Sequence, residues 1–404
     1  MSNVFDVAIV GMGVAGVFCA AKLAKEHKNM KIITFDIGRP PQKRRQQLFG
    51  FLGCLPSSDG KLFSNDLNSV SSLTSSRKVK TAYNQFSKIL SNIGDFEITK
   101  DRAPNVSLVK RFKKFNYDIS LNNYIQLYPK DIHSLSKYMS SIIEENKNIT
   151  CIYDNEVLQV YKSKKCFTLQ MENKQEYFCK KLIIAGGRGG WRWVKDLYAK
   201  FGLIESNDTA HFGVRIETTS TQLKDFNKSN CTITGNNLEI GPLSWFGSII
   251  PEDHTDMAIT AFRSNESRWK SDKVSFNLIG ARPFPGVGFE QTDRLGKLTF
   301  VLTNDRIIKE RVSTLMAGRS KISIIPEYGW LKEILPELGL IVPEIMTKAY
   351  FYVPTISPMA PKINIGDDLS SEVDGMFIVG ESAGVHGILA ASLTGLISAD
   401  SVCK

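Results

Sequence analysis

The sequence predicts an α/β protein that begins with a parallel βαβ unit, and three observations support this fold class. Residues 4–10 form an apolar run of β-type residues. Residues 14–25 carry Ala and Leu at helical spacing, and residues 31–35 form a second short β-type run. Strand, helix and strand in such close succession predict two parallel strands joined by a crossover helix.

The next part of the chain alternates between loop-like and regular segments. Residues 38–80 are rich in Pro, Gly, Ser and basic residues and predict a long loop, a kind of segment that is usually functional. Helices are predicted at residues 81–94 and 131–146, the second of them amphipathic. Apolar or alternating runs predict a small antiparallel meander at residues 151–161, 166–171 and 176–179, followed by a buried strand at residues 181–185.

A second, inserted domain of mixed α+β type is predicted at residues 205–355, where the pattern changes. Short β-like runs occur there at residues 211–217, 257–263, 274–279 and 298–302, between helical pieces. Residues 281–289 contain too much Pro and Gly for regular structure and predict either a loop over the substrate or a connector. A strand at residues 375–380 and a helix at 387–403 then return to the first domain, so the predicted domains are 1–204, 205–355 and 356–404.

The length, net charge and cysteine content of the chain favour some classes of protein over others. The chain has 404 residues, enough for two structural units, and a formal charge of +10. That charge favours anionic partners, nucleic acid among them, or reflects only a Lys-rich solvated surface. The seven cysteines are scattered, with no CxxC pair, which argues against a disulfide framework or a metal site and fits a reducing cytoplasm. Neither residues 7–24 nor 387–399 predict a signal or membrane segment, and nothing indicates an oligomeric state.

Glycines follow the first strand in the pattern Gly11-x-Gly13-x-x-Gly16. Gly11 permits a tight turn, Gly13 allows the backbone to approach a pyrophosphate, and Gly16 lets the helix pack on the sheet. The free N–H groups of Val14 and Ala15 at the helix start would face the phosphates. This is the pattern of a Rossmann-like dinucleotide site.

Two acidic residues follow strands at opposite ends of the chain. Asp36 ends the second strand, where a carboxylate accepts hydrogen bonds from the ribose hydroxyls of an adenosine and disfavours a 2′-phosphate. Glu381 follows the strand that delivers Gly380, where it can bind the ribityl hydroxyls of a flavin. The helix that opens at Gly387 and Ile388 can direct its N-terminus at the pyrimidine edge of the flavin ring. Because a nicotinamide dinucleotide has no ribityl chain, the pair of sites predicts FAD.

The chain resembles the FAD-dependent oxidoreductases of the glutathione-reductase-like superfamily, and most closely their bacterial NAD(FAD)-utilising dehydrogenase branch. Residues 57–62 (SSDGKL) resemble the SDGKL loop of that branch, residues 211–217 (HFGVRIE) its GVRIE strand, and residues 380–388 its GEGAGYAGGI run. Ser382 replaces a glycine of that run and Val385-His386 replace a Tyr-Ala pair, so the reaction can differ from that of the branch.

The resemblance implies further contacts with the cofactor. Arg44 or Arg45 would lie over the pyrophosphate, although both residues could equally belong to a solvated basic loop. Val157 would pair its backbone with the adenine, and Ala185-Gly186-Gly187 would pass close to the dinucleotide. The loop that carries Asp59 would also lie at the cofactor.

Four side chains are candidates for work on the substrate, since the flavin itself performs the redox chemistry. Lys61 could place positive charge near the flavin, and His386 could move a proton near neutral pH. Arg215 and Arg282 could bind a carboxylate or a phosphate. Each also has a structural interpretation: a solvated lysine, a histidine that only donates a hydrogen bond, or an arginine in an ion pair.

Several functions remain open at this point. The leading hypothesis is an enzyme in which FAD accepts a hydride from a C–N or C–C bond of an anionic substrate. A second combines the basic charge with the aromatic residues near Trp191 and Trp245, and resembles flavoenzymes that process a modified base in nucleic acid, although such residues are more often core. A non-catalytic flavin-binding protein and a nicotinamide enzyme without flavin are further alternatives, the latter disfavoured because no second GxGxxG occurs mid-chain.

Overall fold

The computed structural model describes residues 4–44, 47–264, 266–303, 307–357 and 360–403. The chain divides into two compact units. The first comprises residues 1–98, 125–206 and 359–404, and the second comprises residues 99–124 and 207–358. The second unit therefore combines residues 207–358 with residues 99–124, which the sequence analysis left in the first domain.

The first unit is built on a seven-stranded sheet in the order β6-β2-β1-β9-β8-β7, with β21 also paired to β9. Its strands are β1 (Val4–Val10), β2 (Ile32–Phe35), β6 (Ile149–Ile152), β7 (Val157–Lys162), β8 (Phe167–Met171), β9 (Glu176–Ile184) and β21 (Met376–Ile378). β6, β2, β1, β9 and β21 run parallel, whereas β7, β8 and β9 form an antiparallel meander. The predicted parallel βαβ start is present.

Two details of this sheet differ from the sequence prediction. Residues 176–179 and 181–185 were predicted as separate strands but belong to one strand, β9. The apolar pattern breaks at Lys180 and Lys181 because both side chains make polar contacts. Lys180 Nζ donates to Asp6, and Lys181 Nζ donates to the carbonyl oxygen of Val402. In addition, Cys151 lies in β6, parallel to β2, and not in the meander.

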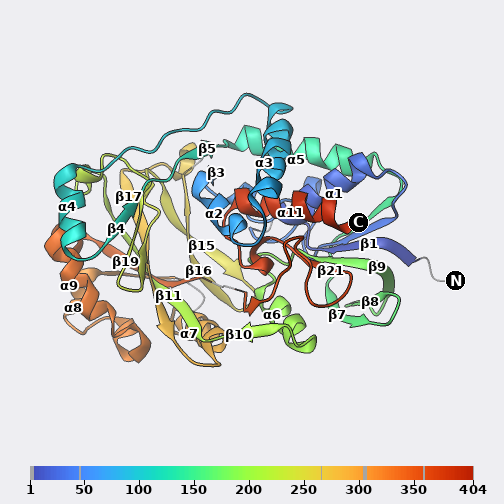
Figure 1. The fold of residues 1–404 in the computed structure, drawn as a ribbon. Helices are drawn as coiled ribbons and strands as arrows, with labels where there is room; N and C mark the ends of the chain where they lie inside the picture. The colour runs from blue at the N-terminus through green and yellow to red at the C-terminus, as the bar shows by residue number, and fades with distance from the viewer. Residues whose placement is uncertain (1–3, 45–46, 265, 304–306, 358–359, 404) are drawn as a thin grey trace. The chain divides into compact units, whose positions relative to one another are not determined.

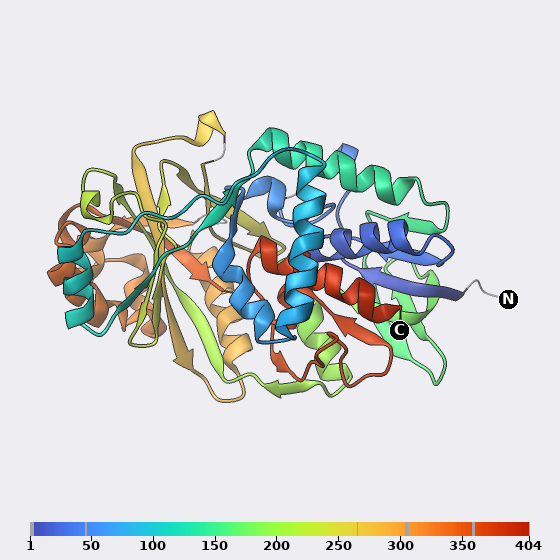
Figure 2. The same ribbon diagram turned by 45° about the horizontal axis from the view of Figure 1, so that its top comes forward.

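Both faces of the sheet are covered, as expected for buried parallel strands. Alternate residues of β1 point to opposite sides: Val7 and Ile9 join one hydrophobic cluster, and Ala8 and Val10 join another. The first cluster contains α1 (Val14–Glu26), α3 (Ser76–Ser91), α5 (Pro129–Glu144) and α11 (Ile388–Val402), and the second contains α6 (Trp191–Lys200) (Figures 1 and 2).

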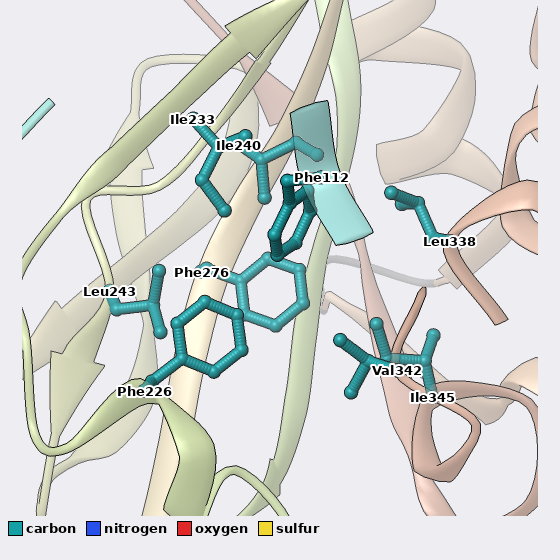
Figure 3. Close-up of a pocket in the computed structure, with 9 residues that line it drawn as sticks. All are labelled: Phe112, Phe226, Ile233, Ile240, Leu243, Phe276, Leu338, Val342 and Ile345. Carbon is teal, nitrogen blue, oxygen red and sulfur yellow. The ribbon is translucent and has the colours of Figure 1, made fainter. Parts of the chain in front are cut away.

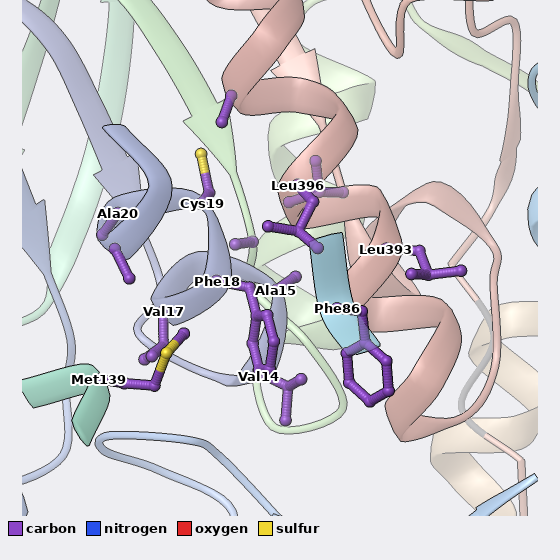
Figure 4. Close-up of a cluster of buried hydrophobic side chains, with 14 of the residues drawn as sticks. Val14, Ala15, Val17, Phe18, Cys19, Ala20, Phe86, Met139, Leu393 and Leu396 are labelled. Carbon is purple, nitrogen blue, oxygen red and sulfur yellow. The ribbon is translucent and has the colours of Figure 1, made fainter. Parts of the chain in front are cut away.

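α1 and α11 pack side by side although they lie far apart in sequence (Figure 4). Phe18 on α1 stacks on Phe86 of α3 with 5.8 Å between ring centroids. A Cβ at Gly395 of α11 would lie 2.2 Å from the carbonyl oxygen of Ala15, so only glycine permits this close approach. The contact holds the N-terminal and C-terminal helices of this unit together.

Residues 38–80 are more ordered than the predicted loop. They contain β3 (Lys61–Phe63), the 3₁₀ helices η2 (Leu55–Ser57) and η3 (Ser64–Asp66), and the short helix α2 (Leu67–Ser71). β3 pairs with β5 (Tyr124–Gln126). α3 already begins at Ser76, because Val79 and Ala82 bury one helical face together with Phe86 and Leu90. Short elements such as these carry too few residues for a periodic pattern to reveal them.

The second unit is built on an eight-stranded sheet in the order β18-β19-β11-β17-β13-β12-β4, with β14 also paired to β17. Its described strands all pair antiparallel. Its strands are β4 (Asp118–Ser120), β11 (Thr209–Thr219), β12 (Thr232–Gly235), β13 (Leu238–Ile240), β14 (Ser244–Trp245), β17 (Lys273–Pro283), β18 (Ile308–Arg311) and β19 (Tyr350–Ile356). The pairing of β4 with β12 explains why residues 99–124 belong to this unit.

Helices and a hairpin complete the two units. The second unit also contains the hairpin of β15 (Ser248–His254) and β16 (Met257–Arg263), and the helices α4 (Val106–Lys114), α7 (Gly288–Thr303), α8 (Val312–Met316), α9 (Leu331–Ile341) and α10 (Glu344–Lys348). The first unit contains the short pair of β10 (Ile204–Ser206) and β20 (Lys362–Ile363).

Two predictions for the second unit were wrong. Residues 298–302 were predicted as a strand but lie within α7, where Val301 is 75% exposed, so the run is not a buried strand. Residues 281–289 were predicted to be irregular, yet β17 continues to Pro283 and α7 begins at Gly288. Pro283 is tolerated because it is the last residue of its strand.

A small gap in the second unit lies between the sheet and α4, α9 and α10 (Figure 3). Its lining is entirely apolar: Phe112, Phe226, Ile233, Ile240, Leu243, Phe276, Leu338, Val342 and Ile345. Substrate sites combine apolar walls with a few polar groups that fix orientation. We therefore interpret this gap as a feature of core packing.

Among the described residues, no helix is long and apolar enough to cross a membrane.

Candidate cofactor and substrate sites

The glycine turn after β1 has the geometry that a pyrophosphate requires. Gly11 has φ +101°, and a Cβ there would lie 2.2 Å from the carbonyl oxygen of Ala185. A Cβ at Gly16 would lie 1.9 Å from the carbonyl oxygen of Gly11. At Gly13, by contrast, the nearest atom would be the Cα of Gly53 at 3.9 Å, so space remains beside the backbone. Because Gly13 is the N-cap of α1, no capping side chain competes for the N–H groups at the helix start.

Two further glycine turns follow β9, which is a parallel neighbour of β1, and β21, which runs parallel to β9. A Cβ at Gly186 would lie 2.6 Å from Val194 of α6. Gly380 has φ +64°, donates its N–H to Thr394, and would carry a Cβ 3.2 Å from that of Ala15. Since the carboxyl ends of parallel strands meet at one edge of a sheet, the turns from both ends of the chain lie together. Gly187 follows with φ +57°.

Asp36 is buried at the end of β2 and accepts three backbone hydrogen bonds. Met12 donates to Oδ2 at 2.7 Å, while Gly38 and Gly50 donate to Oδ1 at 2.7 and 2.8 Å. Burial raises the pKa of this carboxyl, and the three N–H donors oppose that rise. A carboxylate accepts about four hydrogen bonds. About one acceptor position therefore remains for the predicted contact with a ribose hydroxyl.

Arg44 organises the loop beside the glycine turn. Its guanidinium donates to the carbonyl oxygens of Phe51 at 2.6 Å and Gln47 at 3.1 Å, and also to that of Gly53. Burial lowers the pKa of Arg44 to about 10. These contacts hold the loop against Gly13; the predicted contact with the pyrophosphate stays a prediction. Arg45 lies outside the described residues.

The SDGKL-like segment forms a tight loop in front of β3. Lys61 Nζ lies 3.8 Å from Asp59 Oδ2, and both side chains are largely buried. Gly60 has φ +73°, and its carbonyl oxygen accepts the N–H of Leu127 at 2.8 Å. β3 contacts α11, which places the loop in the same unit as the C-terminal turn. That Asp59 and Lys61 lie at the cofactor stays a prediction.

The C-terminal turn carries Glu381 and His386 just before α11. His386 Nδ1 lies 3.8 Å from Glu381 Oε1. Gly387, the N-cap of α11, has φ +95°, and Ile388 is the first helical residue. The Val157 backbone, predicted to pair with adenine, begins β7 opposite Met171.

Asp66 is a polar residue of this region that the sequence analysis missed. A Cβ at Gly387 would lie 1.9 Å from Asp66 Oδ2, and the carboxyl accepts the N–H of Leu389. Burial raises the pKa of Asp66 to about 7, although His386 and the Leu389 N–H oppose that rise. The residue lies in the segment predicted as loop, where a single aspartate forms no pattern.

In the second unit, Arg215 and Arg282 lie on opposite faces of the sheet. Arg215 pairs with Asn277, whereas Arg282 pairs with Ala210, in a ladder without register shifts. Because side chains alternate along a strand, positions 277 and 282 of β17 point to opposite sides. The two candidate arginines are therefore not brought together.

Arg215 lies on a polar face of this sheet. It is 7% exposed, donates from Nε to Ser275 Oγ at 3.1 Å, and lies 5.5 Å from the Phe262 ring. On the same face, Glu217 accepts the hydroxyl of Tyr352 at 2.9 Å. A buried guanidinium is a candidate site for an anion.

Arg282 and the two tryptophan segments have structural environments. The Arg282 guanidinium lies 4.5 Å from the Trp330 ring, and burial lowers its pKa while Glu333 opposes the change. Trp191 and Trp245 are 3% and 7% exposed, and Trp245 donates its indole N–H to the carbonyl oxygen of Ser229. Neither ring offers an open stacking surface for a base.

Comparison with known proteins identifies the family. The model of the pyridine nucleotide-disulphide oxidoreductase family matches residues 5–236, more than half of the chain. The chain belongs to this family. It is therefore an FAD-dependent oxidoreductase, as the resemblance and the fold class predicted.

The solved structures that resemble this oxidoreductase do so with low sequence identity and low TM-scores. Glycine oxidase from Geobacillus kaustophilus shares 16% identity over 99% of this chain and 95% of its own, with a TM-score of 0.45. The halogenase PltM shares 13% identity over 98% and 67% of the two chains, also with a TM-score of 0.45. Glycine oxidase from Bacillus cereus ATCC 14579 shares 14% identity over 98% and 94%, with a TM-score of 0.41. Such distant likenesses carry no argument about the reaction, and no curated protein matched the chain.

The residues of the oxidoreductase fit FAD. The space beside Gly13 and the uncapped start of α1 suit its pyrophosphate, and the remaining acceptor position of Asp36 suits its adenosine ribose. Glu381 and the start of α11 are the proposed partners of the flavin half. When bound there, FAD would supply the redox chemistry.

Proposed function

We propose that this oxidoreductase transfers a hydride from a C–N or C–C bond of a small anionic substrate to FAD, and that Arg215 binds the substrate anion. The observation that carries the proposal is the buried Arg215 guanidinium on the polar face of β11, β17 and β19. A guanidinium binds a carboxylate or phosphate through two parallel hydrogen bonds and keeps its charge when buried.

Neighbouring groups support this assignment. Ser275 accepts the Nε–H of Arg215 and fixes that end of the guanidinium. Two side chains hold Glu217: the Tyr352 hydroxyl donates to it, and Lys309 Nζ lies 3.6 Å from it. All of these residues lie on strands and not on loops. Side chains anchored on strands hold a bound group with little freedom, which is what orientation for hydride transfer requires.

The source of electrons is proposed to be the substrate and not a nicotinamide. A nicotinamide-binding domain needs a parallel sheet with a glycine-rich turn, whereas the described strands of the second unit pair antiparallel. Thiol chemistry is also not favoured, because none of the seven cysteines, all of them described, forms a disulfide and no CxxC pair occurs in the sequence. The modified-base alternative loses support because Trp191 and Trp245 are buried.

Two residues of the first unit complete the proposal. Lys61 would place a positive charge at the cofactor, and His386 would accept or donate a proton. Arg215 would bind the substrate anion, and FAD would accept the electrons. We assign no substrate role to Arg282, which stacks on Trp330 on the other face of the sheet.

Anaerobic reduction of the bound flavin tests this proposal. Amino acids, N-methyl amino acids and 2-hydroxy acids, each paired with its neutral amide, are mixed with the holoenzyme while absorbance near ~450 nm is followed. We expect an acid to bleach the flavin and its amide to fail. Arg215→Met should raise the substrate concentration needed by at least about tenfold, consistent with loss of a bidentate ion pair.

Arg319→Met, which removes an exposed arginine of the same unit, serves as the matched control and should leave that concentration unchanged. Equal reduction by acids and amides, or an Arg215→Met enzyme with unaltered substrate dependence, would contradict the proposal. Rapid reduction by NADH or NADPH with none by any acid would also contradict it.

A further inference from the structure

Asp66 places a carboxyl group at the start of α11 from a different segment of the chain. It is the last residue of η3, and its Oδ2 lies where a Cβ of Gly387 would be. The carboxyl accepts the N–H of Leu389, in the first turn of the helix. Asp66 therefore caps α11 in place of Gly387, which has no side chain to do so.

The positive end of the α11 dipole attracts this carboxyl. α11 has 15 residues and no acidic residue in its own first turn. An ionised Asp66 is thus the negative charge that faces the partial positive charge at the helix start. Ionisation is nevertheless costly, because Oδ2 is buried and accepts no hydrogen bond among the described residues.

Few other charges act on Asp66. His386, which precedes Gly387, lowers the pKa of Asp66 when it is protonated, and Glu381 in turn lies 3.8 Å from His386. From β3, Lys61 is paired with Asp59. α2 carries no ionisable side chain, and the first on α11 is Asp400, which pairs with Lys22 at the far end of the helix.

The same helix start is the proposed neighbour of the flavin's pyrimidine edge, where reduction places negative charge. A reduced flavin and an ionised Asp66 would then both depend on one helix N-terminus. Two like charges close together disfavour each other, so one of them is expected to gain a proton. The carboxyl is the group that can do so without changing the redox state of the cofactor.

We propose that the Asp66 carboxylate takes up one proton from solvent when FAD is reduced and releases it when FAD is reoxidised. In reduction, a substrate C–H bond breaks and its hydride, two electrons and one proton, moves to FAD, which gains one negative charge. The solvent proton forms an O–H bond on Asp66 and removes one negative charge. The net charge at the start of α11 therefore stays constant through the reaction.

The ionisation behaviour of Asp66 agrees with this role. Burial raises the pKa of its carboxyl to about 7. At neutral pH the group then lies near its midpoint, so a modest added negative charge is enough to protonate it. An exposed aspartate would stay ionised whatever the flavin did.

The test measures the midpoint potential of FAD in the holoenzyme between about pH 5 and 9, with redox dyes as electron donors. In the wild-type protein the midpoint potential should fall more steeply with pH in a window that begins near the pKa of Asp66. The additional slope should be about 30 mV per pH unit, the value for one extra proton taken up with two electrons. Asp66→Asn should lack this additional slope. The spectrum of the reduced flavin, recorded at each pH, reports ionisation of the ring itself separately.

Asp6→Asn is the matched control, because Asp6 is a paired carboxyl at the opposite end of β1 and should leave the curve unchanged. If Asp66→Asn fails to fold or to hold FAD, His386→Asn provides the second test. Since His386 lowers the pKa of Asp66, its removal should move the window to higher pH. A wild-type slope in Asp66→Asn, or an unmoved window in His386→Asn, overturns the proposal.

Discussion

Gly395 on α11 touches the backbone of Ala15 on α1, so the helices from the two ends of the chain come into backbone contact there. A Cβ at residue 395 would lie 2.2 Å from the Ala15 carbonyl oxygen. The obstacle is backbone and not a flexible side chain, and α1 also carries the N–H groups proposed to face FAD. Packing of this helix pair and the geometry of the cofactor turn are therefore linked.

Gly395→Ala should destabilise the protein, because the added methyl forces α1 and α11 apart. Overpacking of a buried contact costs about 1–3 kcal/mol. The free energy of unfolding in urea would measure this loss. A variant as stable as the wild type would show that the helices can separate without cost.

Gly13→Ala should lower FAD affinity and leave the stability of the protein almost unchanged. Its Cβ would meet only the Gly53 Cα at 3.9 Å, and its φ of −65° suits any residue. Stability of the FAD-free protein should change by less than about 0.5 kcal/mol, as for mutations away from special features. FAD affinity should fall by at least about tenfold, because the methyl occupies the space meant for the pyrophosphate. Titration of the FAD-free protein with FAD measures this, and undiminished affinity would place the pyrophosphate elsewhere.

Asp66 should make the stability of the FAD-free protein fall as pH rises from about 4 to about 7. Its pKa is raised from 3.8 to about 7 in the folded state. In this window the folded protein binds more protons than the unfolded chain, so stability declines by at most about 1.4 kcal/mol per pH unit and is constant above it. Thermal unfolding of wild type and Asp66→Asn at matched pH isolates this contribution from that of Asp36, whose pKa is also raised. Parallel curves for the two proteins would contradict the assignment.

Arg282→Met should alter stability little, because two effects oppose each other. Loss of the stacking on Trp330 costs about 0.5–2 kcal/mol. Removal of the buried Nε–H donor, which finds no acceptor among the described residues, relieves a penalty of about 1–3 kcal/mol. We expect a net change within about 1 kcal/mol, measured by urea unfolding; a loss above this would show that the stacking dominates.

Much of the first unit was predictable because its signals are local. The turn at Gly11, the strand that ends at Asp36 and the strand before Gly380 each combine an apolar run with a residue type that the turn requires. The family match confirms the resulting identification of an FAD-dependent oxidoreductase. The roles of the individual residues stay predictions.

What the sequence could not reveal depends on contacts between distant segments. Nothing in the loop around Asp66 indicates that Gly387 lies against it. The placement of Arg215 and Arg282 on opposite faces follows from the register between β11 and β17. That register cannot be read from the sequence of either strand alone. The run at residues 298–302 suggested a strand because its apolar residues are adjacent, whereas α7 leaves one of them, Val301, in solvent.

β9 hydrogen-bonds to β8 along its first half and to β21 along its second half. Until β21 has been synthesised and has docked, the second half of β9 presents unpaired backbone groups at the sheet edge. A chain shortened before Met376 would keep that edge open and would expose Ile183 and Ile184 to other chains. We expect such truncations to aggregate during synthesis, so the segment that closes the flavin half of the site also protects the folding intermediate.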